Sequence, residues 1–210
     1  MRGKFIVFEG IDGAGKSTQI EKLKQLTTLQ QGAVHYTQEP TYNAIGQHIR
    51  QQISQPSQAL RDLDLATLFV ADRLDHLLHH EYGILKALEA GQHVVCDRYV
   101  LSSVAYQGLN APLQEVMRLN STCLRMLTPD LTLYFDNPPQ ESLKRVQKRG
   151  TTQDVFEKAQ TLEQLHQNYE QALSTYQDQM PIERIDATQS MEAIHAQIVP
   201  MVAALTNLNL

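Results

Sequence analysis

The sequence predicts a three-layer α/β fold in which a five-stranded parallel sheet carries helices on both faces. Short apolar or β-rich runs alternate along the chain with longer segments of helical periodicity. Most of the short runs are nearly continuous in apolar residues and end in an acidic residue, as is typical of strands buried on both faces of a parallel sheet. The 210 residues contain no internal repeat or low-complexity tract, so we expect residues 1–210 to form one domain.

Five strands are expected, in chain order. Residues 5–8 are wholly apolar, and residues 34–37 are rich in β-branched and aromatic side chains. Residues 93–97 and 131–136 are mainly apolar runs that close with aspartate. Residues 182–186 form the weakest of the five, because charged residues interrupt the apolar ones.

Seven helices are expected between and after these strands, from the spacing of their apolar residues. They cover residues 16–31, 44–54, 61–90, 112–127, 140–149, 162–177 and 190–208. Right-handed crossovers between parallel strands bring the carboxyl ends of the strands to one edge of the sheet, where ligands bind. The polar strings expected at that edge are Glu9-Gly10, Gln38-Glu39-Pro40, Asp97-Arg98 and Asp136-Asn137.

Composition and charge exclude several classes of partner. The 18 basic and 23 acidic residues give a formal net charge of −5, which provides no uniform basic field for a nucleic acid. No window reaches the roughly 18 uncharged apolar residues that cross a membrane, and the apolar run at the N-terminus is too short for a signal peptide. Cys96 and Cys123 stand in apolar surroundings without metal-binding spacing. We therefore expect a cytoplasmic protein with reduced, buried thiols.

Residues 10–18 form the most informative motif. They read Gly-Ile-Asp-Gly-Ala-Gly-Lys-Ser-Thr, with an expected strand before them and an expected helix after them. Glycines let successive backbone N–H groups point inward around a phosphate, and the following helix adds the positive end of its dipole. We expect Lys16 to reach the transferred phosphate and Ser17 to bind Mg²⁺. The motif by itself does not separate kinases from GTPases, motors or transporter ATPases.

Further strings follow in order along almost the whole chain. Residues 68–73 read Leu-Phe-Val-Ala-Asp-Arg, residues 97–108 read Asp-Arg-Tyr-Val-Leu-Ser-Ser-Val-Ala-Tyr-Gln-Gly, and residues 185–188 read Ile-Asp-Ala-Thr. With Asp12 and the turn at 39–41, they resemble the thymidylate kinase family of P-loop nucleoside monophosphate kinases. The resemblance implies the P-loop NTPase fold, Mg²⁺-dependent phosphorylation of dTMP to dTDP by ATP in dTTP biosynthesis, and a homodimer packed through helices.

The resemblance also implies a donor site and a short lid at about residues 145–160. The residues expected at ATP are Gly10, Ile11, Asp12, Gly13, Ala14, Gly15, Lys16, Ser17 and Thr18 of the loop, with Arg145 and Arg149. Ser17 and Asp97 are expected beside the metal. Because a nucleoside monophosphate is already an anionic nucleophile, catalysis is expected to consist of positioning and charge neutralisation. The residues expected to carry it are Asp12, Lys16, Arg98 and Arg149.

For the acceptor, the resemblance implies an aromatic platform and a set of polar contacts. Phe69 is expected to stack on the pyrimidine ring, and Arg73 to donate to its O4 edge, which selects thymine and uracil over cytosine. Tyr106 is expected to crowd the 2′ position of the sugar. The full set expected at dTMP is Asp12, Arg50, Phe69, Arg73, Arg98, Ser103, Tyr106 and Gln107, with Arg98 and Arg50 clamping the monophosphate.

Each of these residues also has an ordinary structural interpretation. Phe69 alone would be a core residue of a long helix, and Arg73 alone a solvated charge. The order of the motifs favours the functional interpretation. His76, His79 and His80 suggest a metal site at helical spacing, but no cysteine or carboxylate set completes one, so a solvated helix face is preferred.

The chain departs from the family in its supply of positive charge. Family members place an arginine either inside the glycine loop, where this chain has Gly13, or in a lid string of the type Asp-Arg-x-Glu. Residues 154–157 here read Asp-Val-Phe-Glu, with Val155 at the arginine position. Arg145, Lys148 and Arg149 remain as substitutes, and Arg149 is the one expected to touch the phosphates of the donor.

Two alternatives stay open on the sequence. One is a kinase of the same fold that acts on a deoxynucleoside or another monophosphate. The other is a nucleotide-binding module with weakened catalysis, which the missing lid arginine favours. Conversely, Lys16, Ser17, Asp12 and Arg98 are all present, and a protein that only bound nucleotides could lose them without penalty.

Overall fold

A computed structural model describes residues 1–27, 32–54, 62–147 and 155–210, with the backbone alone for residues 146, 147 and 155–159. The lid residues Lys148 and Arg149 and residues 150–154 of the expected lid string lie outside the described residues, and the side chain of Val155 is not described.

The centre of the molecule is a parallel sheet of five strands in the order β2-β3-β1-β4-β5. The strands are β1 Phe5–Glu9, β2 Val34–Gln38, β3 His93–Asp97, β4 Leu131–Asp136 and β5 Ile182–Asp186. β1 lies in the middle, where Val7 is in register with Cys96 on one side and Thr132 on the other. All five residues of β1 are buried, which explains its continuous apolar run.

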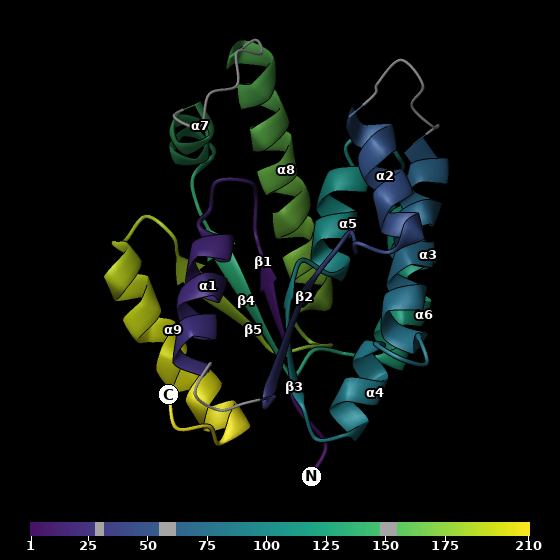
Figure 1. Ribbon diagram of the computed structural model, residues 1–210. Helices are drawn as coiled ribbons and strands as arrows, with labels where there is room; N and C mark the ends of the chain where they lie inside the picture. The colour runs from purple at the N-terminus through teal and green to yellow at the C-terminus, as the bar shows by residue number, and fades with distance from the viewer. Residues whose placement is uncertain (28–31, 55–61, 148–154) are drawn as a thin grey trace.

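Helices cover both faces of this sheet (Figure 1). α1 (Lys16–Thr27) and α9 (Met191–Thr206) pack together on one face. On the other face α3 (Asp62–Leu78), α5 (Val100–Gln107) and α6 (Leu113–Met126) pack against one another. The remaining helices are α2 (Ala44–Ser54) against α3, α4 (Ile84–Glu89) against β3, α7 (Pro139–Gln147), and α8 (Val155–Tyr176) against α5 and α7. The three-layer α/β prediction is confirmed.

Three helix predictions are wrong in detail. α8 begins at Val155, seven residues before the helix expected over 162–177, so residues 155–160 of the expected lid are helical. The segment expected as one helix over 61–90 is divided into α3 and α4, with Gly83 preceding α4. A Cβ at Gly83 would lie 2.4 Å from the carbonyl oxygen of His79, so the chain turns there through a space that only glycine fits. α5 was not expected as a helix; it is short and almost wholly buried, so no amphipathic pattern marks it.

The fold brings four polar strings to one end of the sheet. Glu9, Gln38, Asp97 and Asp136 each close a strand, and the strands run in parallel. The loop 10–15 leaves the end of β1, the central strand, and leads directly into α1. The expected functional residues therefore gather where an open parallel sheet binds its ligands.

Candidate active site

The loop between β1 and α1 is shaped by glycines. Gly10, Gly13 and Gly15 have φ values of 138°, 84° and 98°, which residues with a Cβ rarely adopt. A Cβ at Gly10 would also lie 2.7 Å from the carbonyl oxygen of Phe135. The loop encloses a cavity of about 130 Å³. The residues that line it are Asp12, Gly13, Gly15, Lys16, Ser17, Thr18, Asp97 and Arg98.

Lys16 is buried beneath this loop, and its ammonium group lies against the backbone of the loop. Its Nζ donates to the carbonyl oxygens of Gly10 at 2.7 Å and Ile11 at 3.2 Å. Burial, reinforced by the positive charge of Arg98, lowers the pKa of Lys16 to about 8, against the opposing effect of Asp97 and Asp12. Burial disfavours the charged form of Lys16, and a bound phosphate would favour it. We therefore expect the side chain to bind phosphate as an ammonium group.

This pKa predicts how nucleotide affinity depends on pH. The pKa of Lys16 is lowered, so the free protein loses the ammonium charge above about pH 8, whereas a bound phosphate favours the charged form. Binding above pH 8 must then take up a proton, and ATP affinity should fall by up to about tenfold per pH unit. Calorimetric titration with ATP from pH 7 to 10 measures this. A flat profile through pH 9 would contradict the prediction, and Lys16→Met, which has no titrating amine, is the control.

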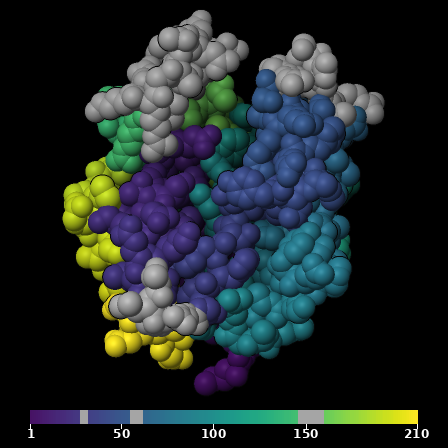
Figure 2. All heavy atoms as spheres, viewed as in Figure 1, coloured from purple at the N-terminus to yellow at the C-terminus, as the bar shows by residue number. Residues whose placement is uncertain are grey.

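A second cavity, of about 240 Å³, opens beside the loop. It is lined by Asp12, Glu39, Pro40, Ile53, Phe69, Arg73, Arg98, Tyr99, Ser102, Ser103, Tyr106 and Gln107. Figure 2 shows a notch in the surface between the purple N-terminal segment and the blue α2, the parts of the chain that carry Asp12 and Ile53. Seven of the eight residues expected at dTMP line this cavity, and it joins the first one because Asp12 and Arg98 line both.

Arg50, the eighth expected dTMP residue, is placed differently. Its guanidinium group donates to the carbonyl oxygens of Pro40, Thr41 and Gly46 and lies 4.5 Å from the ring centroid of Tyr42. In this arrangement Arg50 holds the turn after β2 and does not line the acceptor cavity. A direct contact with the phosphate of the acceptor stays a prediction.

Arg98 lies at the junction of the two cavities, in a left-handed backbone conformation with φ of 74°. Its Nη2 donates to Asp12 Oδ1 at 2.6 Å and to Tyr106 Oη at 3.1 Å, and its Nη1 donates to Ser102 Oγ at 3.1 Å. Burial opposes ionisation of Asp12, but the charges of Arg98 and Lys16 outweigh it and lower its pKa. The strained backbone is held by this network, which fixes a cation and a carboxylate side by side.

Tyr106 lines the acceptor cavity and also contacts the glycine loop. Its Oη also accepts from the backbone N–H of Asp12 at 3.1 Å, and burial raises its pKa to about 12. The hydroxyl group therefore stays protonated at neutral pH. Its ring faces Arg98, whose guanidinium carbon lies 4.7 Å from the ring centroid.

Glu9 was not among the expected site residues, although its hydrogen bonds hold the segment that follows Arg98 in position. This fully buried carboxylate accepts from the backbone N–H groups of Tyr99 and Ser102, and from the hydroxyl groups of Ser102 and Tyr169. It thereby holds the first turn of α5, which follows Arg98, against the end of β1. Its position in the sequence could have indicated this role, because Glu9 is the last residue of β1 and directly precedes the glycine loop.

Arg73 is fully buried and held by four partners. Its Nε donates to Glu39 Oε2 at 2.8 Å, its Nη1 to Asn120 Oδ1, and its Nη2 to Tyr99 O and Ser103 Oγ, both at 3.0 Å. Four of the five N–H groups of the guanidinium therefore have partners among the described residues. The second N–H of Nη1 has no hydrogen-bond partner among the described residues, and Arg73 lines the acceptor cavity. The sequence placed Glu39 at the ligand edge of the sheet but predicted neither its bond to Arg73 nor a role for Asn120. These contacts join the end of β2 and α6 to α3, so no local pattern marks them.

Asn120 has no exposed surface, accepts from Arg73 Nη1, and is not among the described residues that line the cavity. Replacing it by leucine keeps the approximate volume and leaves an Arg73 N–H buried without an acceptor, at a cost of about 1–3 kcal/mol in unfolding free energy. We expect KM for dTMP to rise roughly tenfold while kcat changes little, since the residue orients Arg73. Steady-state kinetics and urea unfolding measure both effects. A loss of kcat with unchanged KM would contradict the positioning role; Asn110→Leu, at an exposed asparagine, is the control.

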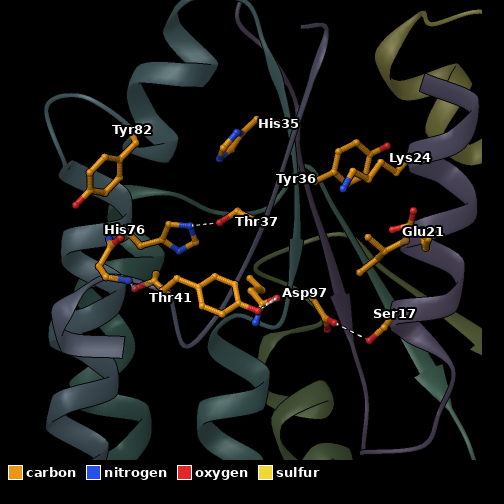
Figure 3. A pocket seen from close by; sticks show the side chains of 14 residues that line it. Ser17, Glu21, Lys24, His35, Tyr36, Thr37, Thr41, His76, Tyr82 and Asp97 are labelled. Atoms are coloured by element: carbon orange, nitrogen blue, oxygen red, sulfur yellow. Dashed lines mark hydrogen bonds between the residues drawn. The ribbon is translucent and has the colours of Figure 1, made fainter. Parts of the chain in front are cut away.

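The pair expected at the metal joins the start of α1, which carries Ser17, to the end of β3, which carries Asp97. Ser17 Oγ donates to Asp97 Oδ2 at 3.2 Å (Figure 3). Asp97 Oδ1 is buried and has no hydrogen-bond partner among the described residues. A hydroxyl oxygen and an unpartnered carboxylate oxygen beside a phosphate-binding loop suit Mg²⁺, which prefers oxygen ligands and keeps several of its waters.

Arg145, expected at ATP, reaches the other side of the loop from α7. Its Nη1 donates to the carbonyl oxygen of Gly13 at 3.3 Å, and its Nη2 to that of Ala187 at 2.9 Å. It therefore links the loop to the turn after β5, the position of the Ile-Asp-Ala-Thr string. Arg149 lies outside the described residues, so its role stays a prediction.

The interpretation of His76 as a solvated residue is wrong. The side chain is buried, its Nδ1 lies 3.1 Å from Glu39 Oε1, and its Nε2 lies 2.7 Å from Thr37 Oγ1. His80 on the same segment is exposed and His79 is half-buried. His76 is still part of α3 and lies on its buried face, whereas His79 and His80 follow the end of the helix at Leu78.

Cys96 and Cys123 are buried free thiols, as expected. Among the described helices, none has both the length and the apolar character that a membrane span requires.

Comparisons with known proteins agree with this geometry. The profile of the family described as "Thymidylate kinase" matches residues 8–198. A thymidylate kinase of Desulfotalea psychrophila is 37% identical over 205 residues, which covers 97% of this chain and 96% of the relative. A probable thymidylate kinase of Pyrococcus abyssi is 35% identical, covering 96% of this chain and 97% of the relative. A thymidylate kinase of Caldicellulosiruptor saccharolyticus is 39% identical over 152 residues, 71% of this chain and 72% of the relative. With a glycine loop, a joined acceptor cavity and these similarities over nearly its whole length, the chain belongs to the thymidylate kinase family.

Proposed function

We propose that this chain transfers the γ-phosphoryl group of ATP to dTMP, giving dTDP, with the glycine loop as the donor site and the 240 Å³ cavity as the acceptor site. The observation that carries the proposal is the Asp12–Arg98 pair, which lines both cavities at once. A phosphate held from either side meets the same guanidinium group, so donor and acceptor would react across this pair.

In the acceptor cavity, polar groups match the edge of a thymine base. Phe69 supplies the aromatic wall, and the remaining N–H of Arg73 suits O4 of the ring. Gln107 Oε1 is buried without a partner among the described residues, and it suits the N3–H donor of thymine. Cytosine presents an amino group where thymine has O4, so two donors would face each other there.

The steps follow from the fixed charges. Lys16 and the backbone N–H groups of the loop hold the β- and γ-phosphates of ATP, and Mg²⁺, held beside Ser17 and Asp97, would neutralise their charge. Arg98 holds the attacking phosphate oxygen of dTMP in line, while Asp12 keeps Arg98 in place. Because the acceptor is already ionised, no residue needs to remove a proton from it. On the donor side, Arg145 and the proposed contribution of Arg149 supply the further positive charge that Gly13 and Val155 lack.

A turnover assay with a panel of acceptors tests the proposal. With ATP and excess Mg²⁺, we expect dTMP to be the best substrate. We expect kcat/KM for dCMP to be lower by at least about 10²-fold, because the amino group of cytosine would be buried against an N–H of Arg73. Thymidine should fail as an acceptor, since it has no phosphate for Arg98. Equal use of thymidine would favour the nucleoside kinase alternative, and tight binding of ATP and dTMP without turnover would favour the binding-module alternative.

We further propose a homodimer in the cytoplasm. Exposed apolar side chains on the adjacent helices α3 and α6, namely Leu63, Leu78 and Met126, support an interface there. The free thiols support a reducing compartment. Light scattering after size exclusion measures the oligomeric state, and a monomer at micromolar concentration would contradict the first part.

A further inference from the structure

Three side chains of the types that bind zinc converge beside the acceptor cavity. Glu39 follows β2, His76 lies in the last turn of α3, and Cys96 lies in β3. One ligand atom of each lies within 4.8 Å of the other two, and all three residues are buried. We propose that they form a site for a thiophilic divalent cation such as Zn²⁺, and that its occupation weakens base binding by Arg73. The second part rests on the proposed function of the cavity.

The donor set is of the kind that zinc takes. A thiolate sulfur, an imidazole nitrogen and a carboxylate oxygen are its common protein ligands, and a fourth position would be left to water. His76 Nδ1 and Glu39 Oε1 lie 3.1 Å apart. Reaching bond lengths of about 2.0–2.3 Å from an ion between the three atoms requires side-chain shifts of roughly half an ångström.

The groups around the three ligands already hold them in position. β3 pairs with β2, where Cys96 is in register with Thr37. Thr37 Oγ1 lies 2.7 Å from His76 Nε2, and Arg73 Nε binds Glu39 Oε2 rather than Oε1. Metal-binding histidines have such a partner on the second ring nitrogen. With an ion on Nδ1, the ring proton moves to Nε2 and is donated to Thr37. The Cys96 thiol donates to the carbonyl oxygen of Arg98 at 3.1 Å; on binding the ion it gives up this bond and releases its proton to solvent.

The cluster borders a cavity at the surface through one of its three residues, His76. A cavity of about 430 Å³ opens beside the edge strand β2 and is lined in part by Thr37, Thr41 and His76. Figure 3 shows the His76–Thr37 pair on one wall of this cavity, with Glu21 and Asp97 across from it. With Lys24, which also lines this cavity, the two carboxylates leave a net negative charge that favours the approach of a cation. The His76 ring is the part of the metal cluster that borders this cavity.

The link to substrate binding runs through Glu39. This carboxylate holds Arg73 through Oε2, and a cation on Oε1 would draw its charge away and repel the guanidinium group. Arg73 would then bind the base less well. By thermodynamic linkage, bound dTMP must weaken metal binding by the same factor.

Metal binding can be measured without any kinase reaction. Titration of the reduced protein with Cd²⁺ in excess Mg²⁺ should produce the ultraviolet charge-transfer absorption of a cadmium thiolate, with one ion bound. Cys96→Ala should abolish this signal, and Cys123→Ala, which removes the other buried thiol, should keep it. Absence of the signal in the unmodified protein, or its persistence in Cys96→Ala, would overturn the site. Circular dichroism checks that Cys96→Ala folds; if it does not, His76→Gln replaces it, with His79→Gln as control.

The effect on dTMP is measured separately. At saturating Mg²⁺ and ATP, buffered Zn²⁺ should raise KM for dTMP roughly fivefold or more, reversed by a chelator and absent in Cys96→Ala. Zinc that inhibits the unmodified protein and Cys96→Ala equally would overturn the link to Arg73. If dTMP is not phosphorylated at all, the proposed function fails, but the Cd²⁺ titration still decides whether the metal site exists.

Discussion

Replacing Lys16 by methionine is expected to lower kcat for dTMP phosphorylation by about 10³-fold or more. The Lys16 ammonium group is the cation buried under the loop, where water cannot screen its charge. Methionine keeps the length of the side chain and removes the charge. A coupled assay of ADP formation measures the loss.

The matched control is Lys22→Met. Lys22 lies on the same helix and pairs with Glu192 at 3.8 Å, away from the loop. Its replacement should leave turnover within about twofold, since exposed ion pairs contribute little. If Lys16→Met kept turnover within tenfold of the unmodified protein, the assignment of the loop to the transferred phosphate would be wrong.

Replacing Arg98 by alanine should reduce kcat by about 10²–10³-fold and raise KM for dTMP. The residue is shared by both cavities and pairs with Asp12, so its loss removes the group expected to align the two phosphates. Arg118→Ala is the control, because Arg118 is an exposed arginine on α6 that pairs with Glu115 within its own helix.

Arg98→Gly separates function from folding. The φ of 74° costs a residue with a Cβ about 1 kcal/mol or more, and glycine avoids that cost. We expect the glycine variant to be more stable than the alanine variant by roughly 0.5–1 kcal/mol in denaturant unfolding, while both lack activity. Activity that tracked stability across the two variants would mean that Arg98 acts only through folding.

Local sequence patterns were sufficient for most of the fold. The five strands lie where apolar or β-rich runs predicted them, because a strand buried in a parallel sheet needs apolar residues on both faces. The short buried helix α5 and the break at Gly83 escaped prediction. α5 is buried around most of its circumference, so its sequence carries no period that distinguishes it from a strand.

For the site, motif order identified the residues that line the two cavities, but not those that support them. Phe69, Arg73, Tyr106 and Gln107 were expected and do line the acceptor cavity. Glu9, Glu39, Asn120 and Tyr169, which hold Arg73 and Arg98 in place, were not assigned this role. His76 was assigned to solvent and is buried.

The sequence alone thus determined the fold class, the phosphate loop and the family, because strand burial, loop glycines and helix periods are local properties of the chain. Only the tertiary structure decided which polar groups are buried together. The contacts Arg73–Asn120 and Glu9–Tyr169 join residues 47 and 160 positions apart. A buried charge is tolerated only where distant partners satisfy it, and their meeting depends on how helices and strands pack. That packing gave Arg73, expected as a base contact, its buried partners Glu39 and Asn120, and it brought Glu39, His76 and Cys96 together.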